Sequence, residues 1–312
     1  MKCVLCNNST FKIIRKKIRH EIPIKVVKCK KCALISLENP SKNIIDYSEP
    51  DYRGKYTSVL GKTLSPKEFF DLEIQFQPAR VNRVNKLLQK KHKVLEIGSS
   101  TGHFLYSIKD KVDEAIGIEL DHKYANFSRK HCNLKILEEP IKDVKLPDNY
   151  FDVIFMFQVF EHIQDPLDFL KHCKRILKPH GKIYLEVPNV DDALLRIFNI
   201  PAFIERYYRA PHTYYYSTNT LNKLLTKAGF KGKTLMSQDY TIFNHMHWIT
   251  TNSPQSSQEY AYNIPDFTVT EKKFKEIEKM IKEFFISTNN KYMKILEKNK
   301  ISENICYLGK LK

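Results

Sequence analysis

The stretch VLEIGSSTGHF, Val94–Phe104, combines three local signals in eleven residues. β-favouring residues fill its first part, Gly98 and Gly102 enclose small polar residues, and a helix-like segment starts at His103. The pattern predicts a strand, a tight turn and the start of a helix. Glycine lets the backbone approach a ligand closely, and the free N–H groups of a new helix point toward that ligand. An ordinary βα corner gives the same pattern, so this turn alone does not establish a binding site.

Two features further along the chain favour the binding site. Residues 115–120, AIGIEL, predict a second apolar strand that ends at Glu119, and an acid at that position can accept hydrogen bonds from ribose hydroxyls. Residues 151–162, FDVIFMFQVFEH, predict a buried strand, which a capped helix from Asp165 and a strand at 182–187 follow. This order and spacing is typical of βαβ units, in which ligands bind beyond the carboxyl ends of parallel strands.

The segments VLEIGSSTGHF, GIEL, FDVIFMFQVFEHI and LKPHGKIYLEVPN together resemble class I S-adenosylmethionine (SAM) dependent methyltransferases, over roughly residues 90–240. The resemblance is greatest to a bacterial branch with a Glu-His pair after the fourth strand and Val-Pro-Asn at the end of the fifth. The frequent G-x-G-x-G of the family is here Gly98-Ser99-Ser100-Thr101-Gly102, and a small serine keeps the turn compact. The resemblance implies an α/β fold with a doubly wound, Rossmann-like sheet of seven strands, the last antiparallel, and with helical insertions.

The resemblance also implies which residues bind SAM. They lie in the first turn, at the end of the second strand and after the fourth strand, and comprise Glu96, Gly98, Ser99, Gly102, Glu119, Leu120 and Gln158. Relatives often have an acidic residue near the third strand that contacts adenine, but Pro140 stands at that position here. The adenine contact is therefore left unassigned.

Four cysteines near the N-terminus form two C-x-x-C pairs, Cys3–Cys6 and Cys29–Cys32, separated by residues 7–28. This spacing can place four thiolates around a structural Zn²⁺, whose binding would supply the folding energy of a short module at 1–40. Disulfides are the alternative, and a cytoplasmic location argues against them. We expect that location because MKCVLCNNST has no apolar signal-peptide segment and no apolar run approaches the ~20 residues of a membrane span.

The four-cysteine module makes the resemblance more specific. A four-cysteine module before a class I methyltransferase domain resembles bacterial sugar methyltransferases, including those that C-methylate nucleotide-linked deoxysugars. Certain ribosomal-RNA methyltransferases also begin with a zinc knuckle. The acceptor predicted from this resemblance is a sugar-containing small molecule, a nucleotide sugar or glycan, in surface-polysaccharide or secondary-metabolite biosynthesis, methylated on oxygen or carbon.

Strand and helix signals divide the 312 residues into five parts. The predicted order is a zinc module at 1–40, a linker or lid with helices at 41–92, a SAM-binding core at 93–240, an insertion at 241–303 and the final strand at 304–312. Within the core, residues 189–216 form an insertion rich in aromatic residues. In class I enzymes the segment after the fifth strand commonly builds the acceptor pocket.

Tyrosines in two of these parts are candidate acceptor-pocket residues, because their rings can stack on a sugar and their hydroxyls can hydrogen-bond to it. The alternative is packing, either of the zinc module on the main domain or of a satellite core beneath the insertion. The candidates are Tyr52, Tyr56, Tyr208, Tyr214 and Tyr216.

Methyl transfer to a hydroxyl or carbon acceptor needs a group that removes a proton, and histidine suits this role because its pKa is near neutral. The candidates are His162, after the fourth strand, and His212, before a tyrosine run, with Glu161 to orient either group. His245 and His247 form a His-x-His pair with no third metal ligand nearby, which favours packing or substrate contact.

The formal net charge is +17, from 52 Lys and Arg against 35 Asp and Glu. The positive residues are mostly lysines spread along the chain, which is typical of a solvated surface, and there is no Arg-rich tract. An RNA methyltransferase is the second function considered, supported by the zinc knuckle and the charge. A non-catalytic SAM-fold scaffold is the third, and Gly98, Gly102 and Glu119 argue against it.

Overall fold

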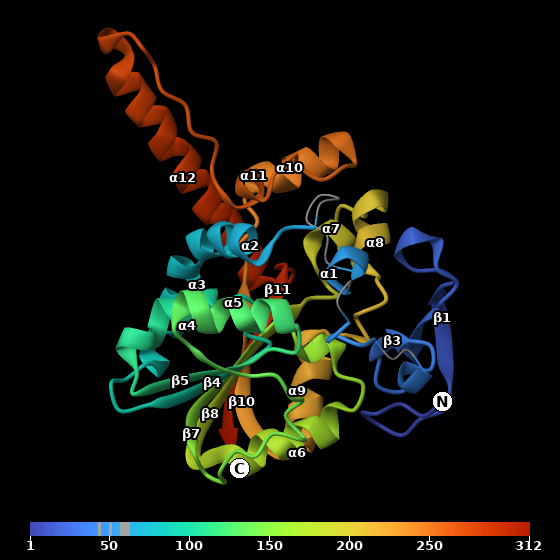
Figure 1. Ribbon diagram of the computed structural model, residues 1–312. Coiled ribbons are helices and arrows are strands. Elements are labelled where there is room, and N and C mark those ends of the chain that lie inside the picture. The colour runs from blue at the N-terminus through green and yellow to red at the C-terminus, as the bar shows by residue number, and fades with distance from the viewer. Residues whose placement is uncertain (43–44, 50–51, 57–62) are drawn as a thin grey trace.

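The computed structural model describes residues 1–42, 45–49, 52–56 and 63–312. Its larger sheet has seven strands in the order β10–β11–β8–β7–β4–β5–β6 (Figure 1). The first five in the chain are mutually parallel, and β11 runs antiparallel between β8 and β10, which confirms the predicted fold class. The strands are β4 (Lys93–Ile97), β5 (Glu114–Ile118), β6 (Lys135–Leu137), β7 (Phe151–Phe157), β8 (Leu177–Pro188), β10 (Phe230–Ser237) and β11 (Asn304–Leu311).

Helices cover both faces of this sheet (Figure 1). On one face lie α2 (Pro66–Glu73), α3 (Gln77–Val84), α4 (His103–Ile108) and α5 (His122–Cys132), and on the other α6 (Pro166–Ile176) and α9 (Thr218–Lys227). Successive side chains of β7 point to opposite faces of the sheet, so the strand contributes to the apolar core on each face. Phe155 packs with the first group of helices, whereas Ile154 and Met156 pack with the second. Burial on both faces explains why the sequence of β7 is an almost unbroken apolar run.

The N-terminal residues form a smaller antiparallel sheet of β1 (Phe11–Arg15), β2 (Val26–Cys29) and β3 (Ile35–Leu37). A fourth strand, β9 (Tyr214–Tyr215), pairs with β3. The aromatic insertion after β8 therefore completes the sheet of the N-terminal module. Lys227 of α9 also donates to the carbonyl oxygens of Val4 and Leu5, at 2.9 and 3.1 Å. The N-terminal module therefore contacts the rest of the chain both at β9 and at α9.

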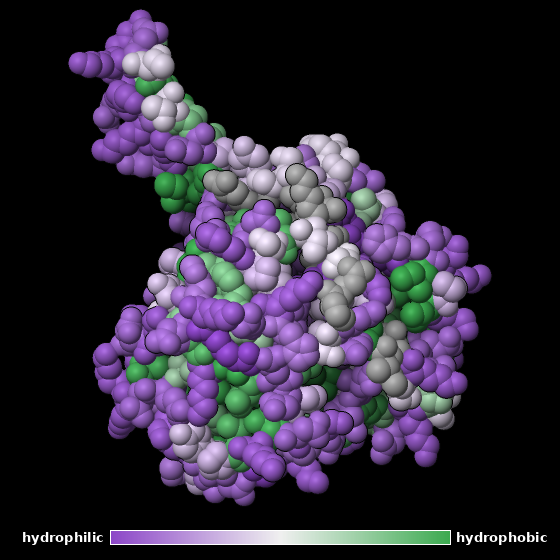
Figure 2. Space-filling view, in the orientation of Figure 1, coloured by the Kyte–Doolittle hydropathy of each residue, from purple (hydrophilic) through white to green (hydrophobic). Residues whose placement is uncertain are grey.

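The remaining helices belong to the segments inserted around the core. They are α1 (Tyr52–Tyr56), α7 (Ala193–Arg196), α8 (Pro201–Tyr207), α10 (Ile242–Thr251), α11 (Gln258–Tyr262) and α12 (Lys275–Lys298). Helix α12 projects away from the rest of the molecule (Figure 1), and its far half exposes apolar side chains such as Ile277 and Phe284 among hydrophilic ones (Figure 2). Within the described part of the chain, no helix is long and apolar enough to cross a membrane.

Candidate active site

A cavity of about 1590 Å³ opens beyond the carboxyl ends of the parallel strands. Its wall includes Gly98 after β4, Glu119 and Leu120 after β5, Gln158 after β7 and Pro188 at the end of β8. Ligands bind at this edge of open α/β sheets because neighbouring loops diverge there. A drug-sized ligand fills roughly 300–1,000 Å³, so the cavity has room for a cofactor and an acceptor together.

The turn after β4 has left-handed backbone at Gly98, Ser100 and Gly102, with φ of 76°, 51° and 75°. A Cβ at Gly98 would lie 2.4 Å from Cγ2 of Val159, so this close approach requires glycine. Gly98 and Ser100 line the cavity, but the predicted contacts Ser99 and Gly102 do not. Ser99 is buried beside Gly117 of β5, and Gly102 is the residue from which α4 starts. Both therefore support the shape of the turn without facing the cavity.

Glu119 is held in place by the same turn. Its carboxylate accepts hydrogen bonds from the N–H groups of Ser100, at 2.7 Å, and Asp121, at 2.8 Å. Burial raises the pKa of Glu119, although the Arg53 guanidinium and these two N–H groups oppose the shift. Each carboxylate oxygen has a second lone pair. Glu119 can therefore accept hydrogen bonds from two neighbouring ribose hydroxyls without leaving its position.

Replacing Glu119 with alanine is expected to weaken SAM binding by roughly 1.5–3 kcal/mol, the value of a hydrogen bond to a charged group. Isothermal titration calorimetry of SAM against the variant measures this loss. The matched control is Glu138→Ala, an acid on the neighbouring loop that pairs with Arg129 and does not line the cavity. Unchanged SAM affinity in Glu119→Ala would contradict the assigned ribose site.

The arginines of the cavity wall were not predicted from the sequence, and Arg53 and Arg80 are two of them. Arg53 of α1 pairs with Asp121 at 2.9 Å and lies over the Tyr124 ring, with Cζ 3.6 Å from its centroid. Arg80 of α3 lies over the Phe157 ring at 4.5 Å and pairs with Glu186 at 3.4 Å. Neither belongs to a recognisable motif, because each comes from a helix outside the strand–turn units. Only the packing of those helices brings the arginines to the cavity.

Glu96, at the carboxyl-terminal part of β4, is 3% exposed and lines the cavity. Among the described residues, its Oε2 has no hydrogen-bond partner. Burial raises the pKa of Glu96 well above its ordinary value, while the positive charge of Arg80 opposes this shift. Arg80 also lines the cavity and acts on Glu96 through its charge.

Glu161, His162 and His212 come together although 50 residues separate the two histidines. The turn after β7 carries Glu161 and His162, and the insertion carries His212. Oε1 of Glu161 lies 3.7 Å from Nε2 of His162 and 3.9 Å from Nε2 of His212. Both histidines line the cavity, and Glu161 is buried behind them. The structure thus unites the three residues predicted for proton transfer.

The surroundings of this cluster determine its protonation. Burial, assisted by the positive charge of Arg209, lowers the pKa of His162 to about 3, and burial lowers that of His212 well below its ordinary value. Burial raises the pKa of Glu161 to about 8. Both imidazoles are therefore neutral at neutral pH. Their lowered pKa makes them weaker bases than the near-neutral pKa expected from the sequence, because a proton acceptor works best when its pKa is close to the working pH.

Of the five tyrosines predicted for the acceptor pocket, only Tyr52 lines the cavity. Tyr216 is fully buried and stacks on Phe160 at 5.6 Å, and the hydroxyl of Tyr214 donates to the carbonyl of Gln164. Tyr56 and Tyr208 pack in the apolar cluster of the N-terminal module, so packing explains these four rings. Other rings line the cavity instead: Tyr47, Phe203, Tyr207, Tyr240, Trp248 and Tyr262.

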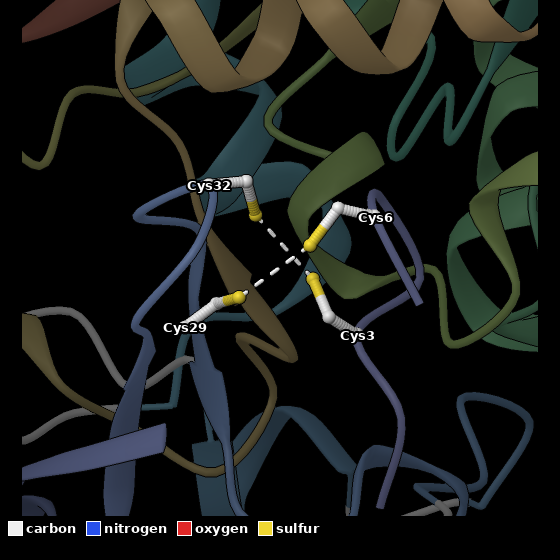
Figure 3. A group of neighbouring side chains, drawn as sticks. All are labelled: Cys3, Cys6, Cys29 and Cys32. Atoms are coloured by element: carbon white, nitrogen blue, oxygen red, sulfur yellow. Dashed lines mark hydrogen bonds between the residues drawn. The ribbon is translucent and has the colours of Figure 1, made fainter. Parts of the chain in front are cut away.

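The four N-terminal cysteines form a separate cluster with their sulfurs turned toward one another (Figure 3). Sγ of Cys3 lies 3.5 Å from Sγ of Cys32, and Sγ of Cys6 lies 3.6 Å from Sγ of Cys29. Tetrahedral zinc with bonds of about 2.3 Å separates its sulfurs by roughly 3.8 Å, so the cluster fits this ion. Burial opposes ionisation of Cys29, but hydrogen bonds from the N–H groups of Cys32 and Lys31 outweigh it and lower the pKa to about 6.

Comparison with known proteins gives consistent results. A family model described as a methyltransferase domain matches residues 72–235. The chain is 20% identical over 219 residues to a ubiquinone biosynthesis O-methyltransferase of Acinetobacter baylyi, covering 65% of this chain and 91% of the relative. It is 28% identical over 179 residues to a tRNA U34 carboxymethyltransferase of Syntrophotalea carbinolica, and the matched region covers 52% of this chain and 52% of the relative.

Among solved structures, a SAM dependent methyltransferase from Archaeoglobus fulgidus is similar to this chain. The TM-score is 0.50 and the identity 20%, and the match covers 78% of this chain and 97% of that one. At this identity the similarity concerns the fold alone.

Proposed function

The chain belongs to the methyltransferase-domain family, and from this premise we propose that its acceptor is a small sugar-containing molecule, such as a nucleotide sugar or glycan. The protein is a SAM-dependent methyltransferase. The acceptor would come from surface-polysaccharide or secondary-metabolite biosynthesis. The observation that carries the proposal is the composition of the cavity wall.

The cavity wall is not basic, in contrast to the chain as a whole. Among the residues that the structure describes, ten Asp and Glu line it, against seven Lys and Arg, although the formal net charge of the chain is +17. Carboxylates accept hydrogen bonds from sugar hydroxyls but repel the phosphates of RNA. Rings such as Tyr207 and Trp248 add flat apolar faces. A hydroxyl-rich small molecule suits these walls better than a polyanion does.

Three half-buried arginines in the wall, Arg19, Arg206 and Arg209, suit a nucleotide-linked sugar. Burial lowers the pKa of Arg19, and the like charges of Arg206 and Arg209 lower it further, so the three groups are close enough to repel one another. A diphosphate would neutralise this repulsion through charge-assisted, bidentate hydrogen bonds. We propose that these arginines hold the diphosphate while the sugar faces His212.

Replacing Arg206 with alanine is expected to raise KM for a nucleotide sugar by roughly 10–100-fold, because one charge-assisted contact contributes about 1.5–3 kcal/mol. The SAM affinity should stay unchanged. Steady-state kinetics at saturating SAM measure the first value and calorimetry the second. Arg196→Ala is the matched control, since Arg196 is an exposed arginine outside the cavity wall. Equal KM values in both variants would contradict the diphosphate site.

When bound, SAM supplies an electrophilic methyl group. We propose that Glu96 and Arg80 hold its amino-acid part, Glu119 its ribose and Gln158 the region between them, with Gly98 and Leu120 in contact. Gln158 donates from Nε2 to Oδ1 of Asn304 at 3.0 Å, which orients it. His212, or His162 beside it, takes the proton of the acceptor, and Glu161, whose carboxyl oxygen lies 3.7 and 3.9 Å from the two Nε2 atoms, orients either group. Zn²⁺ on the four N-terminal cysteines has a structural role in this proposal.

Turnover of labelled SAM by the zinc-loaded protein tests the acceptor class directly. Two pools are offered: nucleotide sugars with glycan extracts, and total RNA. Label in the sugar pool would support the proposal, and its stability to alkali and acid would separate O- from C-methylation. Label in RNA, with binding that weakens steeply as salt rises, would favour the alternative, a zinc-knuckle RNA methyltransferase. The tRNA-modifying relative and the net charge are what support that alternative.

A further inference from the structure

We propose that Glu161, His162 and His212 bind one divalent cation, a first-row transition metal such as Mn²⁺, at the wall of the cavity. One ligand atom from each residue lies within 4.8 Å of the other two. The inference rests on the proposed function, because the cation would act on the oxygen of the same acceptor. Two imidazoles and one carboxylate favour a transition metal over Mg²⁺ or Ca²⁺, which prefer oxygen ligands.

The carboxyl group of Glu161 is the first observation that indicates a cation. Glu161 is 1% exposed, and within the described part of the chain neither of its oxygens has a hydrogen-bond partner. A buried carboxyl group without partners is costly, and native structures seldom leave one so. A cation between Glu161 and the two histidines would compensate this cost directly.

The spacing of the three groups is the second observation. Oε1 of Glu161 is 3.7 and 3.9 Å from the two Nε2 atoms, which is too long for hydrogen bonds. Ligand atoms about 2.0–2.2 Å from a shared metal lie roughly 3.0–3.5 Å apart. The carboxyl oxygen and the two imidazole nitrogens therefore need to approach one another to coordinate an ion, and the ligand atoms start within 4.8 Å of one another.

Tyr47 supports His162 in the way that an outer-shell partner supports a metal ligand. Its hydroxyl lies 2.9 Å from Nδ1 of His162, where it can accept the Nδ1 proton. That tautomer leaves the lone pair of Nε2 directed at Glu161 and His212. Metal-binding histidines commonly have such a partner on the other ring nitrogen, which fixes the ring and its tautomer.

Arg209 already places a positive group beside the cluster. Its Nε donates to Nε2 of His212 at 2.8 Å, so the lone pair that would bind a metal is occupied by this donor. Metal binding must displace the guanidinium from His212. Removal of the Arg209 charge should therefore strengthen metal binding.

The cation would have open coordination positions toward the cavity, since His162 and His212 line it. With the cation bound, the imidazoles would act as its ligands and not as proton acceptors. An acceptor hydroxyl that binds the cation would have a lowered pKa and would give its proton to water in place of a histidine. The oxygen lone pair then forms a bond to the methyl carbon of SAM. The carbon–sulfur bond breaks with its electron pair on sulfur, which gives S-adenosylhomocysteine.

Titration of the zinc-loaded full chain with Mn²⁺, followed by the electron paramagnetic resonance signal of free Mn²⁺, tests the site without reference to activity. We expect one Mn²⁺ per chain. Glu161→Gln and His212→Ala should weaken its binding at least 10-fold, and Arg209→Gln should strengthen it. His172→Ala is the matched control, because His172 also lines the cavity and lies 3.4 Å from a carboxylate oxygen of Asp168. Circular dichroism without Mn²⁺ confirms that each variant is folded, and Glu161→Gln preserves the shape of the side chain.

The outcomes separate this inference from the proposed function. No Mn²⁺ binding by the wild type with SAM present, or equal binding by Glu161→Gln, would overturn the metal site. If protein that contains zinc but no second cation methylates a sugar at the full rate, the proposed role of the second cation is overturned and the proposed function stands. One bound Mn²⁺ that Glu161→Gln removes, without methylation of any sugar, would support the site and reject the sugar acceptor.

Discussion

Replacing His212 with alanine is expected to lower kcat by roughly 10²–10⁴-fold, the contribution of a positioned proton acceptor. The His212 side chain lines the cavity, and its Nε2 lies 3.9 Å from the Glu161 carboxyl group. The ring centroids of His212 and His162 are 4.9 Å apart, and no other described element brings an imidazole as close to His162. The SAM affinity should not change, because the predicted SAM contacts lie on other loops. Single-turnover kinetics with labelled SAM measure the chemical step, and calorimetry measures binding.

His172→Ala is the control for this experiment as well, since it removes an imidazole from the cavity wall outside the cluster. Its kcat should stay within about twofold of the wild-type value. Full turnover by His212→Ala would remove His212 from the mechanism. A similar loss in both variants would indicate a general change of the cavity rather than a role of the cluster.

Replacing Cys32 with serine is expected to release zinc and to lower kcat strongly, although the cysteine cluster lies apart from the cavity wall. Cys32 lies just before β3, which pairs with β9. The N–H of Leu37 donates to the carbonyl of Thr213 at 3.0 Å, directly next to His212. If the loop between β2 and β3 unfolds without its metal, the segment that positions His212 loses its support. Structural zinc supplies folding energy to modules of this size.

Zinc content by mass spectrometry, thermal unfolding and kcat measure these three effects on the same preparation. Cys173→Ala is the matched control, because Cys173 is a buried cysteine in α6, outside the cluster. It should retain zinc and lose only the roughly 1–2 kcal/mol expected for a small cavity. Retention of zinc and full activity in Cys32→Ser would contradict both the metal assignment and the coupling to His212.

The fold was largely predictable because its signals are local. Apolar runs at strand length, the glycine turn after the first strand and the Asp165 cap each depend on residues adjacent in sequence. The spacing between the two C-x-x-C pairs is also a local property, and the structure brings all four sulfurs together. The late position of the last strand was predicted for the same reason, since residues 305–311 form the next apolar run suitable for it.

The cavity wall was predicted less completely. Glu96, Gly98, Glu119, Leu120 and Gln158 line it as expected, whereas Ser99 and Gly102 support the turn from behind. Residue type alone did not show which tyrosines face a ligand. A tyrosine that packs in a core and one that lines a cavity have the same local sequence pattern, and only the packing partner distinguishes them.

The sequence by itself determined the succession of strands and helices in the core, the glycine turn after the first core strand and the pairing of the cysteines in two C-x-x-C motifs, because short-range periodicity and spacing encode them. The seven-stranded sheet followed from the resemblance to a known family. The tertiary structure alone decided that β9 completes the N-terminal sheet, that Arg80 meets Glu186, and that His212 meets Glu161 and His162. These contacts join segments between 50 and about 180 residues apart in the chain. The burial of shared apolar surface brings such segments together, and no local pattern records which of the possible partners will meet.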